Sequence, residues 1–104
     1  MSRTASVCID ASVAVKLFLA EVGSETAKSL LETWLDNGTA IWVPAVFHWE
    51  AAHAVRGAMN RGACDPEMAF EAILGIAELP VSVLPEMHRS LPVTWERFIA
   101  AFGY

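Results

Sequence analysis

The sequence predicts an α/β fold in which a parallel β-sheet is covered by helices on both faces. Short apolar runs alternate along the chain with longer segments whose apolar residues recur at helical spacing. The resulting order is strand, two helices, strand, two helices, strand and helix, and this alternation is typical of parallel sheets. With 104 residues, the chain has the length of one small domain, residues 1–104.

The first half of the chain predicts two strands separated by two helices. The run "VCID" predicts a buried strand over residues 7–10, and a short helix over 11–19 follows, with Ser12 as a candidate N-cap. The segment "SETAKSLLETWLDNG" then predicts a second helix, which its final Asn-Gly pair ends. The run "AIWVPA", residues 40–45, predicts the second strand.

The second half predicts two further helices, a third strand and a last helix. Residues 46–62, "VFHWEAAHAVRGAMNRG", keep helical spacing up to the final glycine. Residues 65–79 begin with an aspartate cap followed by a proline, which suits the first position of a helix. The run "PVSVLP", residues 80–85, predicts the third strand, and residues 91–103 predict the last helix.

The composition argues against several classes of protein. Hydrophobic residues make up 55% and charged residues 18%, which argues against disorder and favours an apolar contact with a partner. The net charge of −5 disfavours nucleic-acid binding by overall charge. No apolar stretch reaches the ~18 residues that span a bilayer, and Asp10 and Lys16 interrupt the N-terminal apolar segment. We therefore expect a cytoplasmic protein without membrane contact, with Cys8 and Cys64 as buried thiols.

Two carboxylates follow the first two predicted strands. Asp10 ends the first strand, and Glu50 lies on the helix after the second strand. In parallel sheets, ligands bind beyond the carboxyl ends of the strands. The neighbours of Glu50 on this helix are small or apolar, so a cation or hydrogen bonds would have to compensate its burial: Val46, Phe47, Ala54 and Gly57. Two converging carboxylates would suit Mg²⁺ or Mn²⁺, which prefer oxygen ligands.

Structural explanations remain open for both acids. Asp10 could cap the helix that starts near Ser12. Glu50 could instead pair with Arg61 or Lys16.

The histidines and tryptophans predict no site of their own. His48 and His53 are five residues apart and therefore point about 140° away from each other on a helix, which disfavours a zinc motif. We expect these two and His88 at the surface or at its boundary. The tryptophans are expected in the core or an interface, with base stacking as the minority alternative: Trp34, Trp42, Trp49 and Trp95.

Three blocks of the chain together resemble PIN domains, and in particular VapC-type toxins. "VCIDASVAVKLFLAEVGSETAKSLLE" resembles the family's opening, in which an acid ends the first strand in a D-x-S/T setting, here Asp10 and Ser12. "WVPAVFHWEAAHAVRGAMNRG" is similar to the second block, in which a proline precedes a helix that carries a glutamate, here Glu50. "LPVSVLP" matches the third strand. The blocks follow one another in the family's order and spacing.

The resemblance implies a three-layer α/β/α fold and a metal-dependent ribonuclease of a toxin–antitoxin system. Asp10 and Glu50 would be ligands of Mg²⁺ or Mn²⁺, and the metal would activate a water that attacks an RNA phosphodiester. Ser12 would be a polar support for the metal-bound water or the phosphate. The implied partners are the RNA substrate and a cognate antitoxin protein.

One part of the family pattern lies beyond this chain. In the family, further acids follow the helix that here reads "WERFIAAFG", whereas this chain ends at Tyr104, and Glu86 and Glu96 do not fall at the motif positions. The resemblance therefore implies a PIN-like domain without its C-terminal strands, in which residues 7–10 form an edge strand that invites a homo-oligomer. The alternatives to an active enzyme are a catalytically incomplete PIN-like module that binds antitoxin or self-associates, and an unrelated α/β binding protein.

Overall fold

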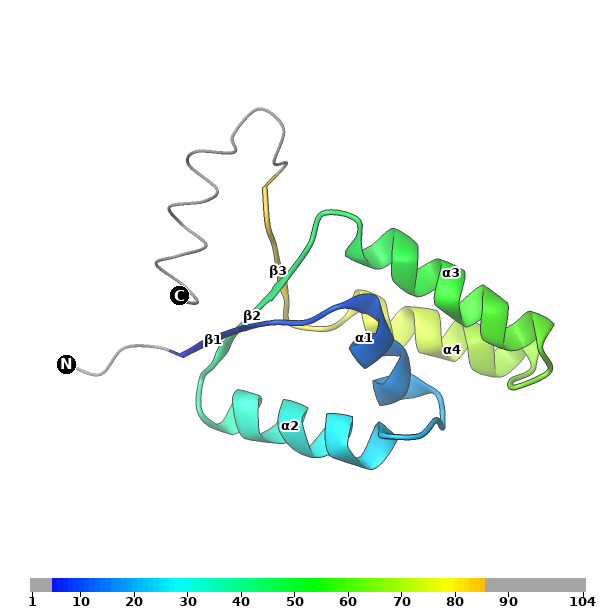
Figure 1. Ribbon diagram of the computed structural model, residues 1–104, viewed down its shortest axis with the longest axis horizontal. Helices are drawn as coiled ribbons and strands as arrows, with labels where there is room; N and C mark the ends of the chain where they lie inside the picture. Colours follow the sequence, from blue (N-terminus) through cyan, green and yellow to red (C-terminus); the bar gives the residue numbers. More distant parts are fainter. Residues whose placement is uncertain (1–4, 86–104) are drawn as a thin grey trace.

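The computed structural model describes residues 5–85 and contains a parallel sheet whose strands follow the order β1-β2-β3 (Figure 1). The strands are β1 (Ser6–Cys8), β2 (Ala40–Val43) and β3 (Ser82–Val83). Val7 lies opposite Ile41, and Val43 lies opposite Val83. The predicted α/β class and the parallel pairing are confirmed. Within the described residues, β1 lies at one edge of this sheet.

The strands are shorter than the runs that predicted them. The ladder continues for one residue past β1, because the Ile9 amide donates to the Trp42 carbonyl at 3.0 Å. Asp10 then leaves the sheet to begin a helix. Pro44, just after β2, has no amide hydrogen to donate to a neighbouring strand. The sheet therefore ends within a residue or two of β1 and β2.

Four helices of the described part connect these strands. They are α1 (Ala11–Phe18), α2 (Ser24–Asp36), α3 (Phe47–Asn60) and α4 (Pro66–Ala77). The helix α1 contacts the other three, and α3 packs along α4 (Figure 1). The predicted helix over 91–103 lies outside the described residues. None of the helices in residues 5–85 is long and apolar enough to cross a membrane.

Local signals in the sequence set several helix ends. Asp65 caps α4 by accepting a 2.8 Å hydrogen bond from the Met68 amide, and Pro66 takes the first helical position. Gly38 and Gly62 follow α2 and α3 with φ values of 65° and 76°, which a residue with a β-carbon rarely adopts. Ser24, the first residue of α2, is buried and donates to the Leu19 carbonyl at 3.0 Å. This hydrogen bond ties the start of α2 to the end of α1.

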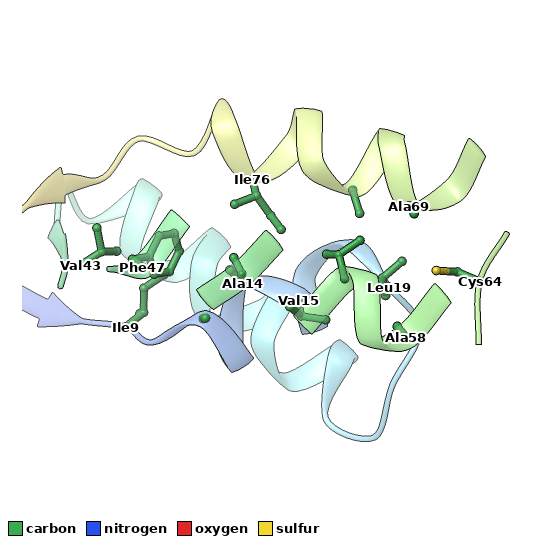
Figure 2. Close-up of a cluster of buried hydrophobic side chains, with 14 of the residues drawn as sticks. Ile9, Ala14, Val15, Leu19, Val43, Phe47, Ala58, Cys64, Ala69 and Ile76 are labelled. Atoms are coloured by element: carbon green, nitrogen blue, oxygen red, sulfur yellow. The ribbon is translucent and has the colours of Figure 1, made fainter. Parts of the chain in front are cut away.

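The core lies between the sheet and the helices. Figure 2 shows Val43, Phe47 and Ile9 gathered at one end of the cluster, where the sheet meets α3. Phe47 is 1% exposed. Small residues on the inner faces of α1, α3 and α4 let these helices approach closely: Ala14, Ala51, Ala58, Ala69 and Ala72. The core therefore fixes the end of β1 relative to the start of α3.

The two faces of the sheet differ within residues 5–85. Ile41 and Val43 point into the core and are 3% and 0% exposed. Cys8 and Ser82, whose side chains lie on the opposite face, are exposed, and Trp42 between them is half-buried. The connection from β1 to β2 and the connection from β2 to β3 both lead to the next strand on the same side in the sheet order. Because connections between parallel strands are right-handed, the helices of both connections are expected on the same face of the sheet. In the described part, the expected cover on both faces is thus seen on one face only, and there it leaves Val83, the partner of Val43, 49% exposed.

Candidate functional site

Asp10 stands where the backbone turns from β1 into α1. It has an extended conformation, with φ −101° and ψ 176°, and it is the N-cap of α1. Its Oδ1 atom accepts a hydrogen bond from the Val13 amide at 3.2 Å. The capping explanation for Asp10 is therefore confirmed. Because this carboxylate is also exposed at the carboxyl end of a parallel strand, capping does not prevent it from binding a ligand.

Ser12 supports Asp10 rather than capping the helix itself. Its hydroxyl donates a hydrogen bond to Oδ1 of Asp10 at 2.6 Å, a length typical of a strong bond to a charged acceptor. The prediction that Ser12 is the N-cap is wrong, since α1 begins at Ala11 and Ser12 lies inside its first turn. The structure thus brings together the two residues of the D-x-S pattern and orients the carboxylate.

These contacts keep Asp10 negatively charged. The Ser12 hydroxyl has the largest effect and lowers the pKa of the Asp10 carboxyl below its ordinary value of 3.8. The Val13 amide lowers this pKa further, and the positive charge of Lys16 adds a smaller effect in the same direction. Partial burial raises the pKa, but less than the Ser12 and Val13 hydrogen bonds lower it. At neutral pH the group is therefore a carboxylate, the form that binds a cation.

Glu50 lies in the first turn of α3, directly after the strand that pairs with β1. Ile9, which precedes Asp10, and Phe47, the first residue of α3, belong to the same core cluster, so the end of β1 and the start of the helix that carries Glu50 are held in one packed region (Figure 2). The carboxyl ends of β1 and β2 form one edge of the sheet, and each acid follows one of these ends. The arrangement therefore places both predicted acids at the same edge.

The expected environment of Glu50 differs from the observed one. Burial of Glu50 among its small and apolar neighbours, which would have needed compensation, is not observed, because its side chain is exposed. An exposed carboxylate carries no burial cost for a cation to offset. Within residues 5–85, Glu50 forms no ion pair with Arg61 or Lys16. Glu50 is consequently an accessible acid at the start of a helix, where the helix dipole favours negative charge.

The described residues offer two predicted acids, Asp10 and Glu50, but no closed cage of protein ligands for a metal ion. They contain no group of three or more His, Cys, Asp or Glu side chains that could hold a metal ion. Mg²⁺ usually keeps several waters and is bound through one or two carboxylates together with substrate phosphates. The two hydrogen bonds to Asp10 both fall on Oδ1, which leaves Oδ2 as the oxygen for a cation. Glu86 and Glu96 lie outside the described residues.

The two cysteines have different environments. Cys64 is buried as expected, whereas the expected burial of Cys8 is wrong. Residue positions alternate between the two faces of a strand, and Cys8 lies on the face that the described helices leave open. Partial burial and, to a smaller extent, the charge of Asp10 raise the pKa of the Cys8 thiol. The neighbouring carboxylate therefore makes Cys8 a weaker acid than a free cysteine.

Trp49 lies at the surface and not in the core. Its side chain is 69% exposed, so the core placement is wrong, whereas the interface and base-stacking alternatives stay predictions. The helical spacing of Phe47, Ala51 and Val55 could have predicted this exposure. These buried residues define the inner face of α3, and Trp49 lies on the opposite side of the helix. His48 and His53 are exposed as expected, whereas His88 and Trp95 lie outside the described residues.

Comparison of the chain with protein-family models, with curated proteins and with solved structures finds no significant match.

Proposed function

We propose that this protein is a metal-dependent ribonuclease of the PIN type, acting as the toxin of a VapBC-like toxin–antitoxin system in the cytoplasm. The observation that carries the proposal is the placement of Asp10. It ends a parallel strand, is oriented by Ser12 and stays charged, and it lies at the sheet edge from which α3 starts with Glu50. The resemblance of three blocks, in order, to PIN domains supports the same function. The three-layer PIN-like fold is part of this proposal.

In this function Asp10 and Glu50 hold Mg²⁺ or Mn²⁺ through carboxylate oxygens. The metal, when bound, lowers the pKa of a water that attacks the RNA phosphodiester. Ser12 keeps the Asp10 carboxylate in one orientation through its 2.6 Å hydrogen bond. The helices α1 and α3 both begin at this edge, and the partial positive charge of a helix N-terminus favours a substrate phosphate there.

A catalytically incomplete module is the second candidate function. It is favoured by the absence, within residues 5–85, of a group of three potential metal-binding side chains. Such a module would bind the cognate antitoxin or form a homo-oligomer. The edge position of β1 among the described strands supports self-association, because an edge strand offers unpaired amide and carbonyl groups.

Cleavage of RNA by the purified full chain distinguishes the two functions. A ribonuclease requires Mg²⁺ or Mn²⁺, loses activity in EDTA and is inactivated by Asp10→Asn and by Glu50→Gln. Glu32→Gln is a matched control, because Glu32 is an exposed acid on α2, away from the carboxyl edge. Metal-dependent cleavage that survives both site substitutions would contradict the assignment of these acids. A chain that cleaves no RNA would favour the binding module, whereas cleavage that needs no metal would contradict both candidate functions.

A further inference from the structure

The outer face of α3 carries an aromatic and cationic surface next to Glu50. Trp49, His53 and Arg56 follow one another at helical spacing, and all three are exposed. The rings of Trp49 and His53 meet edge to face, with centroids 4.6 Å apart and planes at 72°. This contact holds the indole beside a neighbouring ring and restricts its rotation. We call Trp49, His53 and Arg56 the α3 stripe.

The surface of the α3 stripe contains a small, open hollow. Trp49, Ala52, His53 and Arg56 line a hollow of about 210 Å³. Pockets for drug-sized ligands are larger, with volumes of roughly 300–1,000 Å³, and they enclose most of the ligand. A hollow on an exposed helix face does not enclose a ligand, but it leaves the indole free to stack on one.

The charge of this surface differs from that of the whole chain. The net charge is −5, but the two arginines of residues 5–85 both belong to this helix: Arg56 lies on the outer face of α3, and Arg61 is its C-cap residue. The Arg61 guanidinium lies against Gly57, because a β-carbon built at Gly57 would be 3.2 Å from its Nη1 atom. Arg61 therefore runs back along the last turn of the helix as far as Gly57. Arg56, which lines the hollow together with the indole, and Arg61 at the end of the helix are complementary to an extended ligand that has both anionic groups and flat rings.

We propose that the α3 stripe is a subsite for single-stranded RNA, in which a base stacks on Trp49 and the adjoining phosphates contact Arg56 and Arg61. Aromatic stacking combined with a positively charged track is the general way in which proteins bind single strands without reading their sequence. Trp49 precedes Glu50 in the first turn of α3, so a strand on the stripe leads to the candidate metal site. The role as a substrate subsite rests on the ribonuclease function, whereas RNA binding itself does not.

The test is fluorescence anisotropy of a labelled single-stranded RNA of roughly 12 nucleotides, a length within the range that single-strand-binding folds cover. The full chain is titrated in EDTA and low salt, so that binding is measured without cleavage. Stacking of one base corresponds to roughly a 5- to 150-fold change in affinity, so we expect Trp49→Ala to weaken binding at least about fivefold. Trp49→Phe keeps a stacking ring and is expected to keep most of the affinity.

Two further variants separate stacking from charge and from general surface effects. Arg56→Gln removes one phosphate contact, which is expected to reduce the slope of log affinity against log salt by about 0.7. Phe70→Ala is the matched control, because Phe70 is a 64% exposed aromatic residue on α4, outside the stripe. It is expected to leave the affinity unchanged. Circular dichroism of each variant confirms that its helices are intact.

Equal RNA binding by wild type and Trp49→Ala, or no RNA binding by the wild type at low salt, would overturn the proposal. Self-association of the chain that Trp49→Ala abolishes, without any effect on RNA binding, would also overturn it and assign the stripe to a protein contact. The binding measurement in EDTA does not depend on whether the chain cleaves RNA. Binding that depends on Trp49 without cleavage would leave the RNA site standing while the ribonuclease function fails. If the chain cleaves RNA and neither cleavage nor binding changes in Trp49→Ala, the ribonuclease function stands and the RNA site on the α3 stripe fails.

Discussion

The Ser12 hydroxyl donates a 2.6 Å hydrogen bond to Oδ1 of Asp10, the same oxygen that accepts the Val13 amide. The bond connects a residue in the first turn of α1 with the residue that ends the extended segment after β1. It gives Asp10 a structural role, as the cap of α1, and at the same time orients a charged, exposed carboxylate. Substitutions can separate these two roles.

Removal of the Ser12 hydroxyl is expected to raise the pKa of Asp10 toward 3.8, because that hydroxyl is the largest cause of the lowered value. The pKa is measured by following the carboxyl carbon of Asp10 in an NMR pH titration of Ser12→Ala. Ser12→Thr keeps a hydroxyl and serves as the control. An unchanged pKa in Ser12→Ala would show that the hydrogen bond does not stabilise the charged form.

The lowered pKa also predicts how Asp10 affects stability at acidic pH. A carboxyl group whose pKa is lower in the folded state stabilises the protein above its unfolded pKa, and this stabilisation is lost as the pH falls through the folded pKa. We therefore expect the stability difference between wild type and Asp10→Ala to shrink below pH 3.8, the ordinary value for this group. Urea denaturation at a series of pH values measures the difference. A difference that grows toward acidic pH would contradict the sign.

Substitution of Asp10 by asparagine and by alanine is expected to separate capping from metal binding. Asparagine is as good an N-cap as aspartate, whereas alanine at an N-cap costs about 0.5–2 kcal/mol of stability. Asp10→Asn keeps the cap but loses the charge that the Ser12 and Val13 hydrogen bonds stabilise, so it should unfold at a urea concentration between those of the wild type and Asp10→Ala. Calorimetric titration with Mn²⁺ is expected to show weak binding in the wild type and still weaker binding in both variants. Equal Mn²⁺ affinity in all three would remove Asp10 from the metal site.

The thiol of Cys8 reports the charge of Asp10 independently of any metal. Because the Asp10 carboxylate contributes to the raised pKa of Cys8, Asp10→Asn is expected to increase the thiolate fraction and to speed alkylation of Cys8 at neutral pH. Mass spectrometry resolves this reaction from that of Cys64, which is buried and should react slowly in both proteins. The same rate at Cys8 with and without the Asp10 charge would refute the electrostatic coupling.

Alanine substitutions at two glycines inside helices are expected to change the stability of the protein in opposite directions. A β-carbon at Gly75 in α4 would overlap the ring of Phe18 in α1, and such overpacking costs roughly 1–3 kcal/mol. At Gly57 the nearest side-chain atom belongs to exposed Arg61, which can move aside, so alanine gains up to about 1 kcal/mol of helix propensity. Urea denaturation should rank Gly57→Ala above wild type and Gly75→Ala below it. The reverse order would show that the contact between Phe18 and Gly75 does not constrain α1 and α4.

Local patterns in the sequence determined the secondary structure of the described part. The alternation of apolar runs with helical spacing predicted three parallel strands and the four helices between them, with small differences at the ends. The cap at Asp65 and the stops at Gly38 and Gly62 follow from side-chain and backbone chemistry that acts over a few residues. The position of Asp10 at the end of a strand belongs to the same local information.

Only the tertiary structure decided which faces of these elements are covered. A period of 3.6 or 2.0 shows which residues share a face of a helix or strand, but not whether another element packs against that face. For this reason Cys8 was expected to be buried and is exposed, and the sequence did not establish that the side chains of Glu50 and Trp49 lie at the surface. The choice of Asp10 over Ser12 as the cap likewise depends on where the β1 backbone leaves the sheet, because the pairing of β1 with β2 fixes that point.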